Sequence, residues 1–188
     1  MVSLYRSVLR PLLFHADAET AHALGATALG LVHRAPPLAA AVRAALAPPV
    51  YPSLAVSALG MHLAHPFGIA AGFDKGATLS NGLGAPGGSF VEVGTVTAHA
   101  QPGNDRPRLF RLPEDGALLN RMGFNNAGMA AVSARLARCP PRGAAVGVNL
   151  GKSKVTALDA APAEYAALAR TLAPHAASIV AHLNDDHA

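Results

Sequence analysis

The chain has 188 residues, of which 51% are hydrophobic and 14% are charged, a composition that suits one compact domain with a buried core. Its formal net charge is +4, but the basic residues are scattered and few aromatic residues accompany them, which argues against a nucleic-acid-binding surface. The single cysteine, Cys139, excludes an internal disulfide bond, and no apolar run reaches the roughly 18 residues that a membrane span requires.

The start of the chain predicts two helices with large apolar faces, over residues 3–14 and 18–33. In the first helix, Leu4, Val8 and Leu12 recur at helical spacing. The second helix carries an apolar stripe made of Ala21, Leu24, Ala28, Leu31 and Val32. Asp17 stands where the N-cap of this second helix belongs.

Two interpretations of this helical hairpin stay open on the sequence. In the first, the hairpin packs its apolar faces against its own domain, as amphipathic helices usually do. In the second, it lies on a bilayer surface, with Arg6, Arg10 and Arg34 near the lipid head groups.

Prolines beyond residue 34 mark a connector, with a third short helix predicted over 38–47 and a β-hairpin over 54–63. After the connector, strand-like runs alternate with helix-like runs. The predicted strands cover 67–71, 90–96, 144–150 and 178–183, and the predicted helices between them cover 76–83, 126–138 and 161–172. Apolar runs without polar alternation are typical of strands buried on both faces, so these segments predict βαβ units with a parallel sheet.

This α/β pattern suits either a doubly wound sheet or a barrel. The first strand is followed by AAGFDKG and not by the G-x-G-x-x-G of a dinucleotide-binding sheet, which favours the start of a barrel. In barrels the functional residues lie at the carboxyl ends of the strands. A long loop over 99–125 interrupts the second unit, and loops of this length are usually functional.

Candidate functional residues stand at these strand ends. Small residues followed by Lys75 let a flat ring approach the backbone and place a cation beside it, although an ordinary turn with a solvated lysine fits equally well. The hydroxyl of Thr95 can hydrogen-bond a ring carbonyl, but threonine is also a common strand residue. Asn149 has fewer structural explanations, because a buried amide needs partners, and we expect it to contact a ligand.

The long loop ends in the string NRMGFNN, whose asparagine amides suit a heterocyclic ring with amide edges. The alternative for Asn125 or Asn126 is an N-cap of the following helix. The nine histidines lack ligand-like spacing, except for the last pair, and no cysteine accompanies them, so we expect no metal site.

The strings AAGFDK, GTVT, QPGNDRPRLFRL, NRMGFNN and GVNLGKSK, in this order, resemble dihydroorotate dehydrogenase over about residues 3–177. The leading YRSVLRPLLFHADAETAHALG resembles the extension of the quinone-dependent, class 2 enzymes, where it forms an apolar tunnel for quinone. The resemblance implies an α/β fold, the front half of a (β/α)8 TIM barrel, preceded by an amphipathic helical hairpin. It divides the chain into a helical extension over 1–48 and an incomplete barrel domain over 49–188.

The resemblance also implies a flavoprotein oxidoreductase that uses FMN to oxidise dihydroorotate to orotate in de novo pyrimidine (UMP) biosynthesis. Quinone would reoxidise the flavin at the cytoplasmic face of a bacterial inner membrane, to which the protein would bind peripherally. The residues implied for FMN are Ala71, Gly72, Phe73, Asp74, Lys75, Thr95 and Asn149. Those implied for dihydroorotate or orotate are Lys75, Asn120, Arg121, Met122, Gly123 and Phe124.

The end of the sequence departs from the family pattern, in which a catalytic serine follows the fourth strand. Residues 181–188 read AHLNDDHA, with His182 roughly where the family has a flavin-contacting asparagine and Asp185 roughly where it has the serine. We therefore expect a chain that stops before the serine motif, with four of eight strands and without the phosphate site that follows strands seven and eight. The alternatives are a catalytically inactive module that binds membranes or itself, and a half barrel that dimerises to complete its flavin site.

Overall fold

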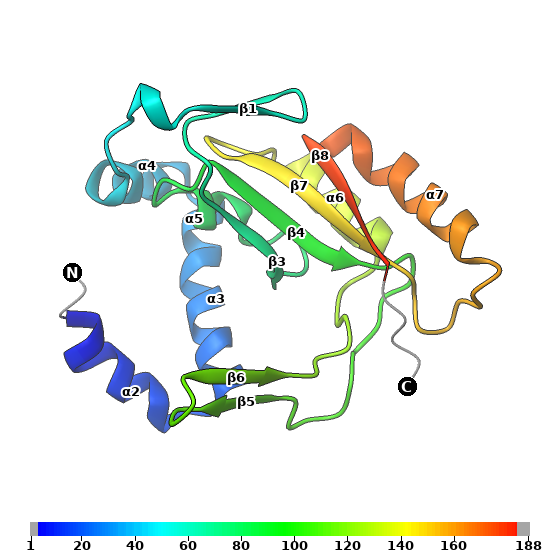
Figure 1. The fold of residues 1–188 in the computed structure, drawn as a ribbon, viewed down its shortest axis with the longest axis horizontal. Coiled ribbons are helices and arrows are strands. Elements are labelled where there is room, and N and C mark those ends of the chain that lie inside the picture. Colours follow the sequence, from blue (N-terminus) through cyan, green and yellow to red (C-terminus); the bar gives the residue numbers. More distant parts are fainter. Residues whose placement is uncertain (1–3, 184–188) are drawn as a thin grey trace.

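The computed structural model describes residues 4–183, and a parallel sheet of four strands runs through the centre of this part of the chain (Figure 1). In spatial order its strands are β3 (Gly68–Asp74), β4 (Phe90–Val96), β7 (Ala145–Gly151) and β8 (Ser178–His182). All neighbouring pairs are parallel. The predicted βαβ alternation is therefore confirmed, and each strand begins within one residue of its predicted start.

The outer face of the sheet forms the hydrophobic core. Helices α6 (Met129–Arg138) and α7 (Ala161–Leu172) lie along this face (Figure 1). Val93 and Val148 from the sheet are fully buried there, together with Leu168 from α7. Each such side chain stabilises the fold by roughly 1.5 to 3 kcal/mol relative to exposure, so this layer holds the strands in place.

The opposite face of the sheet carries the polar side chains. Glu92 of β4 lies beside Gly147 of β7, and Asn149 follows two residues later on the same face. The register between the two strands shifts by one residue between Val93 and Val96, so that Val96, not Thr95, pairs with Leu150. The shift returns Val96 to the core and leaves Thr95 on the face of Asn149.

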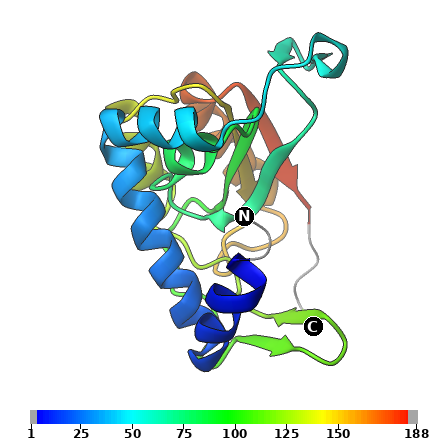
Figure 2. The same cartoon turned by 90° about the vertical axis from the view of Figure 1, so that its left-hand side faces the viewer.

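The amino-terminal region is helical, as predicted, and comprises η1 (Tyr5–Leu9), α2 (Arg10–His15), α3 (Ala18–Arg34) and α4 (Pro36–Leu46). Asp17 caps α3, because its Oδ1 atom accepts hydrogen bonds from the backbone N–H groups of Glu19 and Thr20, both at 3.0 Å. Helix α3 runs along the side of the molecule and packs against α5 (Ser80–Gly84) (Figure 2). None of the helices in the described range 4–183 is long and apolar enough to cross a membrane.

The long loop over 99–125 differs from the prediction, because it contains an antiparallel hairpin of β5 (Leu109–Leu112) and β6 (Ala117–Asn120). The turn between them includes Gly116, which has a positive φ of 61°. This hairpin lies at the same end of the molecule as α2 and the start of α3 (Figure 2). A second, shorter hairpin, β1 (Val56–Ala58) and β2 (Met61–Leu63), confirms the prediction for 54–63.

Two predicted helices begin later than expected. The helix predicted over 76–83 is reduced to α5, because the carboxylate of Asp74 accepts the N–H groups of Thr78 and Leu79 and holds this segment as a turn. The N-cap of α6 is Gly128, so neither Asn125 nor Asn126 caps this helix as the alternative reading proposed. Two 3-10 turns, η2 (Pro52–Leu54) and η3 (Ala173–His175), complete the described elements.

Candidate functional site

Lys75 lies just past the carboxyl end of β3, half-buried against the end of the long loop. Its Nζ atom donates to Asn125 Oδ1 at 2.7 Å and contacts Met122 Sδ at 2.6 Å. Burial, followed by the positive charge of Arg108, lowers the pKa of Lys75 from its ordinary value, and Glu19 opposes this effect. The lysine is therefore a partly desolvated cation held beside the NRMGFNN string, and not the freely solvated side chain of an ordinary turn.

The turn that follows β3 is fixed by Asp74, which is only 1% exposed. Its two carboxylate oxygens each accept a backbone N–H, from Thr78 and from Leu79, at 2.9 Å. The carboxylate thus points into the turn. It fixes the backbone from which Lys75 projects.

The small residues before this turn leave open space beside the backbone. Gly72 is exposed, has a positive φ of 106°, and a Cβ atom added to it would meet nothing within 4 Å. Ala71 beside it is half-buried. Such a surface permits a flat ring to approach the strand closely, which is the property expected of these residues for FMN.

Thr95 and Asn149 meet on the polar face of the sheet, opposite α6 and α7, which we call the inner face. The Thr95 hydroxyl donates to Asn149 Oδ1 at 2.8 Å, and Asn149 Nδ2 donates to Glu92 Oε1 at 2.8 Å. Thr95 is 8% exposed and Asn149 5% exposed, so both are nearly buried. Sequence reasoning missed Glu92, although a carboxylate inside the apolar run FVEVGTV was a signal that could have revealed it.

Only some residues of the NRMGFNN string lie near Lys75. Met122 contacts Lys75, and the Phe124 ring stands edge-on to His182 with 5.5 Å between the ring centroids. Asn120 instead accepts the N–H of Met122 at 2.9 Å, and the exposed Arg121 side chain donates to a loop carbonyl. The structure therefore places Met122 and Phe124 at the strand ends, whereas the side chains of Asn120 and Arg121 stabilise the loop.

Gly123 makes a close backbone approach within this string. Its φ is positive at 70°, and an added Cβ atom would lie 2.8 Å from side-chain atoms of Asn104. Asn104 in turn donates to the carbonyl of Arg121 at 2.8 Å. The two ends of the long loop are thereby held together.

The buried carboxylate of Glu164 hydrogen-bonds to the two segments that follow β4 and β7. Glu164 of α7 accepts hydrogen bonds at Oε1 from Ser153 N at 2.9 Å, from Ser153 Oγ at 2.5 Å and from Ala98 N at 3.2 Å. Burial opposes the charge, but the hydrogen bonds from Ser153 and its neighbours outweigh it and lower the pKa of Glu164. Sequence reasoning missed this anchor, because Glu164 reads as an ordinary first-turn acid of a helix.

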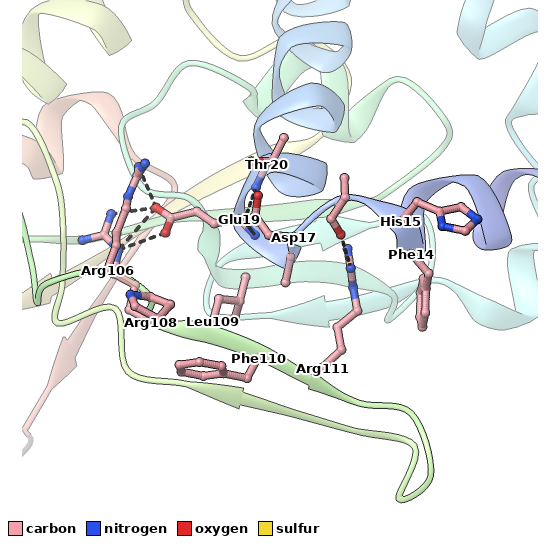
Figure 3. Close-up of a pocket in the computed structure, with 13 residues that line it drawn as sticks. Phe14, His15, Asp17, Glu19, Thr20, Arg106, Arg108, Leu109, Phe110 and Arg111 are labelled. Atoms are coloured by element: carbon pink, nitrogen blue, oxygen red, sulfur yellow. Dashed lines mark hydrogen bonds and ion pairs between the residues drawn. The ribbon is translucent and has the colours of Figure 1, made fainter.

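Ion pairs and a hydrogen bond join the helical hairpin to the long loop. Glu19 of α3 pairs with Arg108 at 2.8 Å and with Arg106 at 2.9 Å (Figure 3). Arg111 donates to the carbonyl of Ala16 at 2.7 Å and lies over the Phe14 ring, 4.6 Å from its centroid. These groups line an open cavity of about 700 Å³ between the α2–α3 corner and β5.

The helical hairpin also contacts the end of β3, through His22 of α3. The ring of His22 meets the ring of Phe73 edge-on, with centroids 4.8 Å apart. Burial, followed by the positive charge of Lys75, lowers the pKa of His22, which favours the neutral form of the imidazole. The helical extension and the candidate ring-binding strand are therefore in direct contact.

The sequence also led us to expect no metal site, and His182 and Asp185 near the positions of the family's asparagine and serine. Among the described residues, no group of three or more His, Cys, Asp or Glu side chains is arranged to hold a metal ion. His182 lies at the end of β8 against Phe124, whereas Asp185 lies outside the described residues.

Comparisons with known proteins identify the family of the chain. Residues 53–184 match the family model described as dihydroorotate dehydrogenase. The chain is 50% identical over 184 residues to a dihydroorotate dehydrogenase (quinone) of Roseiflexus sp. (strain RS-1), covering 98% of this chain and 50% of the relative. It is also 50% identical over 178 residues to a protein of the same name from Anaeromyxobacter sp. (strain K), covering 94% and 47% of the two chains.

A crystal structure of DHODH from Eimeria tenella in complex with ferulenol superposes with a TM-score of 0.73 at 32% identity, covering 90% of this chain and 44% of that one. The likeness confirms the expected α/β fold of the TIM-barrel type with a helical amino-terminal part. The chain spans about half the length of the curated relatives it matches. It belongs to the dihydroorotate dehydrogenase family.

Proposed function

We propose that this chain contributes the front half of a flavin site for the oxidation of dihydroorotate to orotate, with quinone as the final electron acceptor. The observation that carries the proposal is the position of Lys75, a partly desolvated cation beside the open strand end at Gly72. Relatives that share half of the residues of this chain bear the name dihydroorotate dehydrogenase (quinone), which supports the same substrate and acceptor.

FMN, when bound, supplies the acceptor for the hydride that leaves dihydroorotate. The residues present fit its ring: Ala71 and Gly72 permit close approach, and the backbone around Phe73 and Asp74 continues that surface. Lys75 would stabilise negative charge on the reduced ring or on the substrate carboxylate. Thr95 and Asn149 would offer hydrogen bonds to the polar edge of the ring.

The substrate would lie between Lys75 and the NRMGFNN string. Met122 and Phe124 would pack against it, and Gly123 would allow the backbone to come close. Asn120 and Arg121, whose side chains bind the loop itself, would shape this wall and contact substrate through the backbone. A dihydroorotate carboxylate facing the ammonium group of Lys75 would gain a charge-assisted hydrogen bond.

The test is the visible spectrum of the 188-residue chain after incubation with FMN and removal of the excess by gel filtration. We expect the ring-side contacts to retain flavin in the protein peak, and its absorbance to shift when orotate is added. Protein that elutes without flavin would overturn the proposal for this chain and favour the inactive module. Flavin that co-elutes only at high protein concentration, with a larger apparent mass, would favour the dimerising half barrel.

We further propose that residues 1–48 act as a separate extension that binds a membrane surface and admits quinone. The leucines of the helical hairpin are strongly exposed: Leu12 is 63%, Leu24 58% and Leu31 59% exposed. Arg10 lies beside it, 5.0 Å from the Phe14 ring centroid, as suits a basic residue at a lipid head-group boundary. The contact between His22 and Phe73 joins the extension to the proposed ring-binding strand, so quinone bound to the extension would lie close to the flavin ring. In a bacterium this surface would be the cytoplasmic face of the inner membrane.

Co-sedimentation with vesicles of phosphatidylcholine and anionic phosphatidylglycerol tests this extension. We expect the unchanged chain to sediment and the double variant Leu12→Glu/Leu24→Glu to bind at least tenfold more weakly, because two apolar side chains are withdrawn from the interface. The matched control is Val155→Glu, at a residue 81% exposed outside the extension. Equal binding by the double variant and the control would contradict the assignment.

A further inference from the structure

Glu92 is a polar side chain on the inner sheet face that the proposed flavin site does not use. It is half-buried in β4, within a run whose other residues are apolar, Gly or Thr. Leaving a carboxylate half-buried is unfavourable unless hydrogen bonds compensate for the lost hydration. The structure shows such a bond, from Asn149 Nδ2 to Glu92 Oε1 at 2.8 Å.

The bond determines which way the Asn149 amide faces. A carboxylate only accepts hydrogen bonds, so the amide must turn its NH2 group toward Glu92. Its oxygen then faces Thr95, whose hydroxyl donates to it at 2.8 Å. If the amide were flipped, two acceptors would oppose each other at Glu92, and the carboxylate therefore excludes that orientation.

An oriented amide has defined groups left for a ligand. Asparagine has two N–H donors and two lone pairs on its oxygen, and the contacts with Glu92 and Thr95 use one of each. One donor and one lone pair of Asn149 thus keep fixed directions at the carboxyl end of β7. The register shift after Val93 is what brings Thr95 to this face, so the arrangement depends on both strands.

We propose that Glu92 is a positioning residue, which fixes the amide orientation of Asn149 and so presets the hydrogen bonds offered to the flavin ring. The second half of this statement rests on the proposed function, whereas the first half concerns the chain alone. Glu92 itself touches neither cofactor nor substrate. Its acceptor atom, and not its charge, is the property that matters, so glutamine can substitute for it and leucine cannot.

The first experiment needs no flavin. A long-range HNCO spectrum of the labelled, unchanged chain should show a correlation across the hydrogen bond from Asn149 Nδ2 to Glu92 Cδ. The bond from Asn126 Nδ2 to the Phe124 carbonyl, at 2.7 Å, serves as the internal reference. If the reference correlation is seen and the Asn149 correlation is missing, the proposal is overturned, whether or not the chain binds FMN.

The second experiment measures FMN dissociation constants by quenching of flavin fluorescence. We expect Glu92→Leu to weaken FMN binding about tenfold, the size expected when one oriented hydrogen bond is lost, and Glu92→Gln to stay within about threefold. Glu114→Leu, at an exposed turn residue between β5 and β6, is the matched control. In an Asn149→Ala background, Glu92→Leu should add nothing further, because the amide that it orients is gone.

These results separate the two claims. An unchanged chain that binds no FMN contradicts the proposed function, while the NMR correlation still decides whether Glu92 orients Asn149. Equal weakening by Glu92→Gln and Glu92→Leu would show that charge matters and overturn the acceptor role. Full weakening by Glu92→Leu in the Asn149→Ala background would assign Glu92 a different, direct effect on the flavin site.

Discussion

Lys75→Met is expected to weaken orotate binding to the FMN-loaded chain strongly and to leave the fold intact. Methionine keeps the length and apolar stem of lysine and removes only the ammonium group. That group is partly desolvated between Met122 and Asn125, where a charge-assisted hydrogen bond to a carboxylate is strong. Its loss should weaken orotate binding by about 10- to 100-fold.

Orotate binding can be followed by the change it causes in the flavin absorption spectrum. Lys154→Met is the matched control, because Lys154 is exposed and lies past the end of β7. Both variants should show the same far-ultraviolet circular dichroism as the unchanged chain. An orotate affinity for Lys75→Met equal to that of Lys154→Met would remove Lys75 from the substrate site.

The depressed pKa of Lys75 gives this prediction a pH dependence. Burial and Arg108 lower the pKa of the amine, so the cation is lost at a lower pH than an exposed lysine would lose it. Orotate binding should therefore weaken as pH rises through that lowered pKa. In Lys75→Met this component of the pH dependence should disappear.

The sequence was sufficient to predict the strands, because their apolar runs are local properties of the chain. It could not assign the two faces of β4. In FVEVGTV a strict alternation would place Thr95 with Val93, in the core, and the register shift against β7 reverses this. The partners of Glu92 and Thr95 are therefore visible only once β4 and β7 are paired.

Residues that are far apart in the sequence account for the other differences. The Lys75–Asn125 bond joins positions fifty residues apart, and Glu164 reaches Ala98 across sixty-six residues. Helix α5 is shorter than its pattern predicts because the Asp74 carboxylate captures backbone N–H groups that a longer helix would need. The β5–β6 hairpin is the exception, because its Asp115-Gly116 turn is a local signal that favours a hairpin.

Gly94→Ala is expected to destabilise the fold most severely among single substitutions at the inner sheet face. Gly94 has a positive φ of 121°, which an L side chain rarely adopts. An added Cβ atom would also lie 2.5 Å from the Asn149 carbonyl oxygen and 3.2 Å from Asn149 Cβ. Because both neighbours belong to the adjacent strand β7, they cannot move without disturbing the pairing of β4 with β7.

Gly72→Ala separates the two causes, since Gly72 has a similar φ of 106° but nothing within 4 Å of an added Cβ atom. Urea unfolding should show a loss of roughly 1 to 3 kcal/mol for Gly72→Ala, from backbone strain alone. Gly94→Ala should lose at least about 2 kcal/mol more, or show no cooperative transition, because the collision adds to the strain. Equal losses would mean that β4 and β7 can separate at this point, and the close contact that places Thr95 beside Asn149 would then not be a rigid feature of the site.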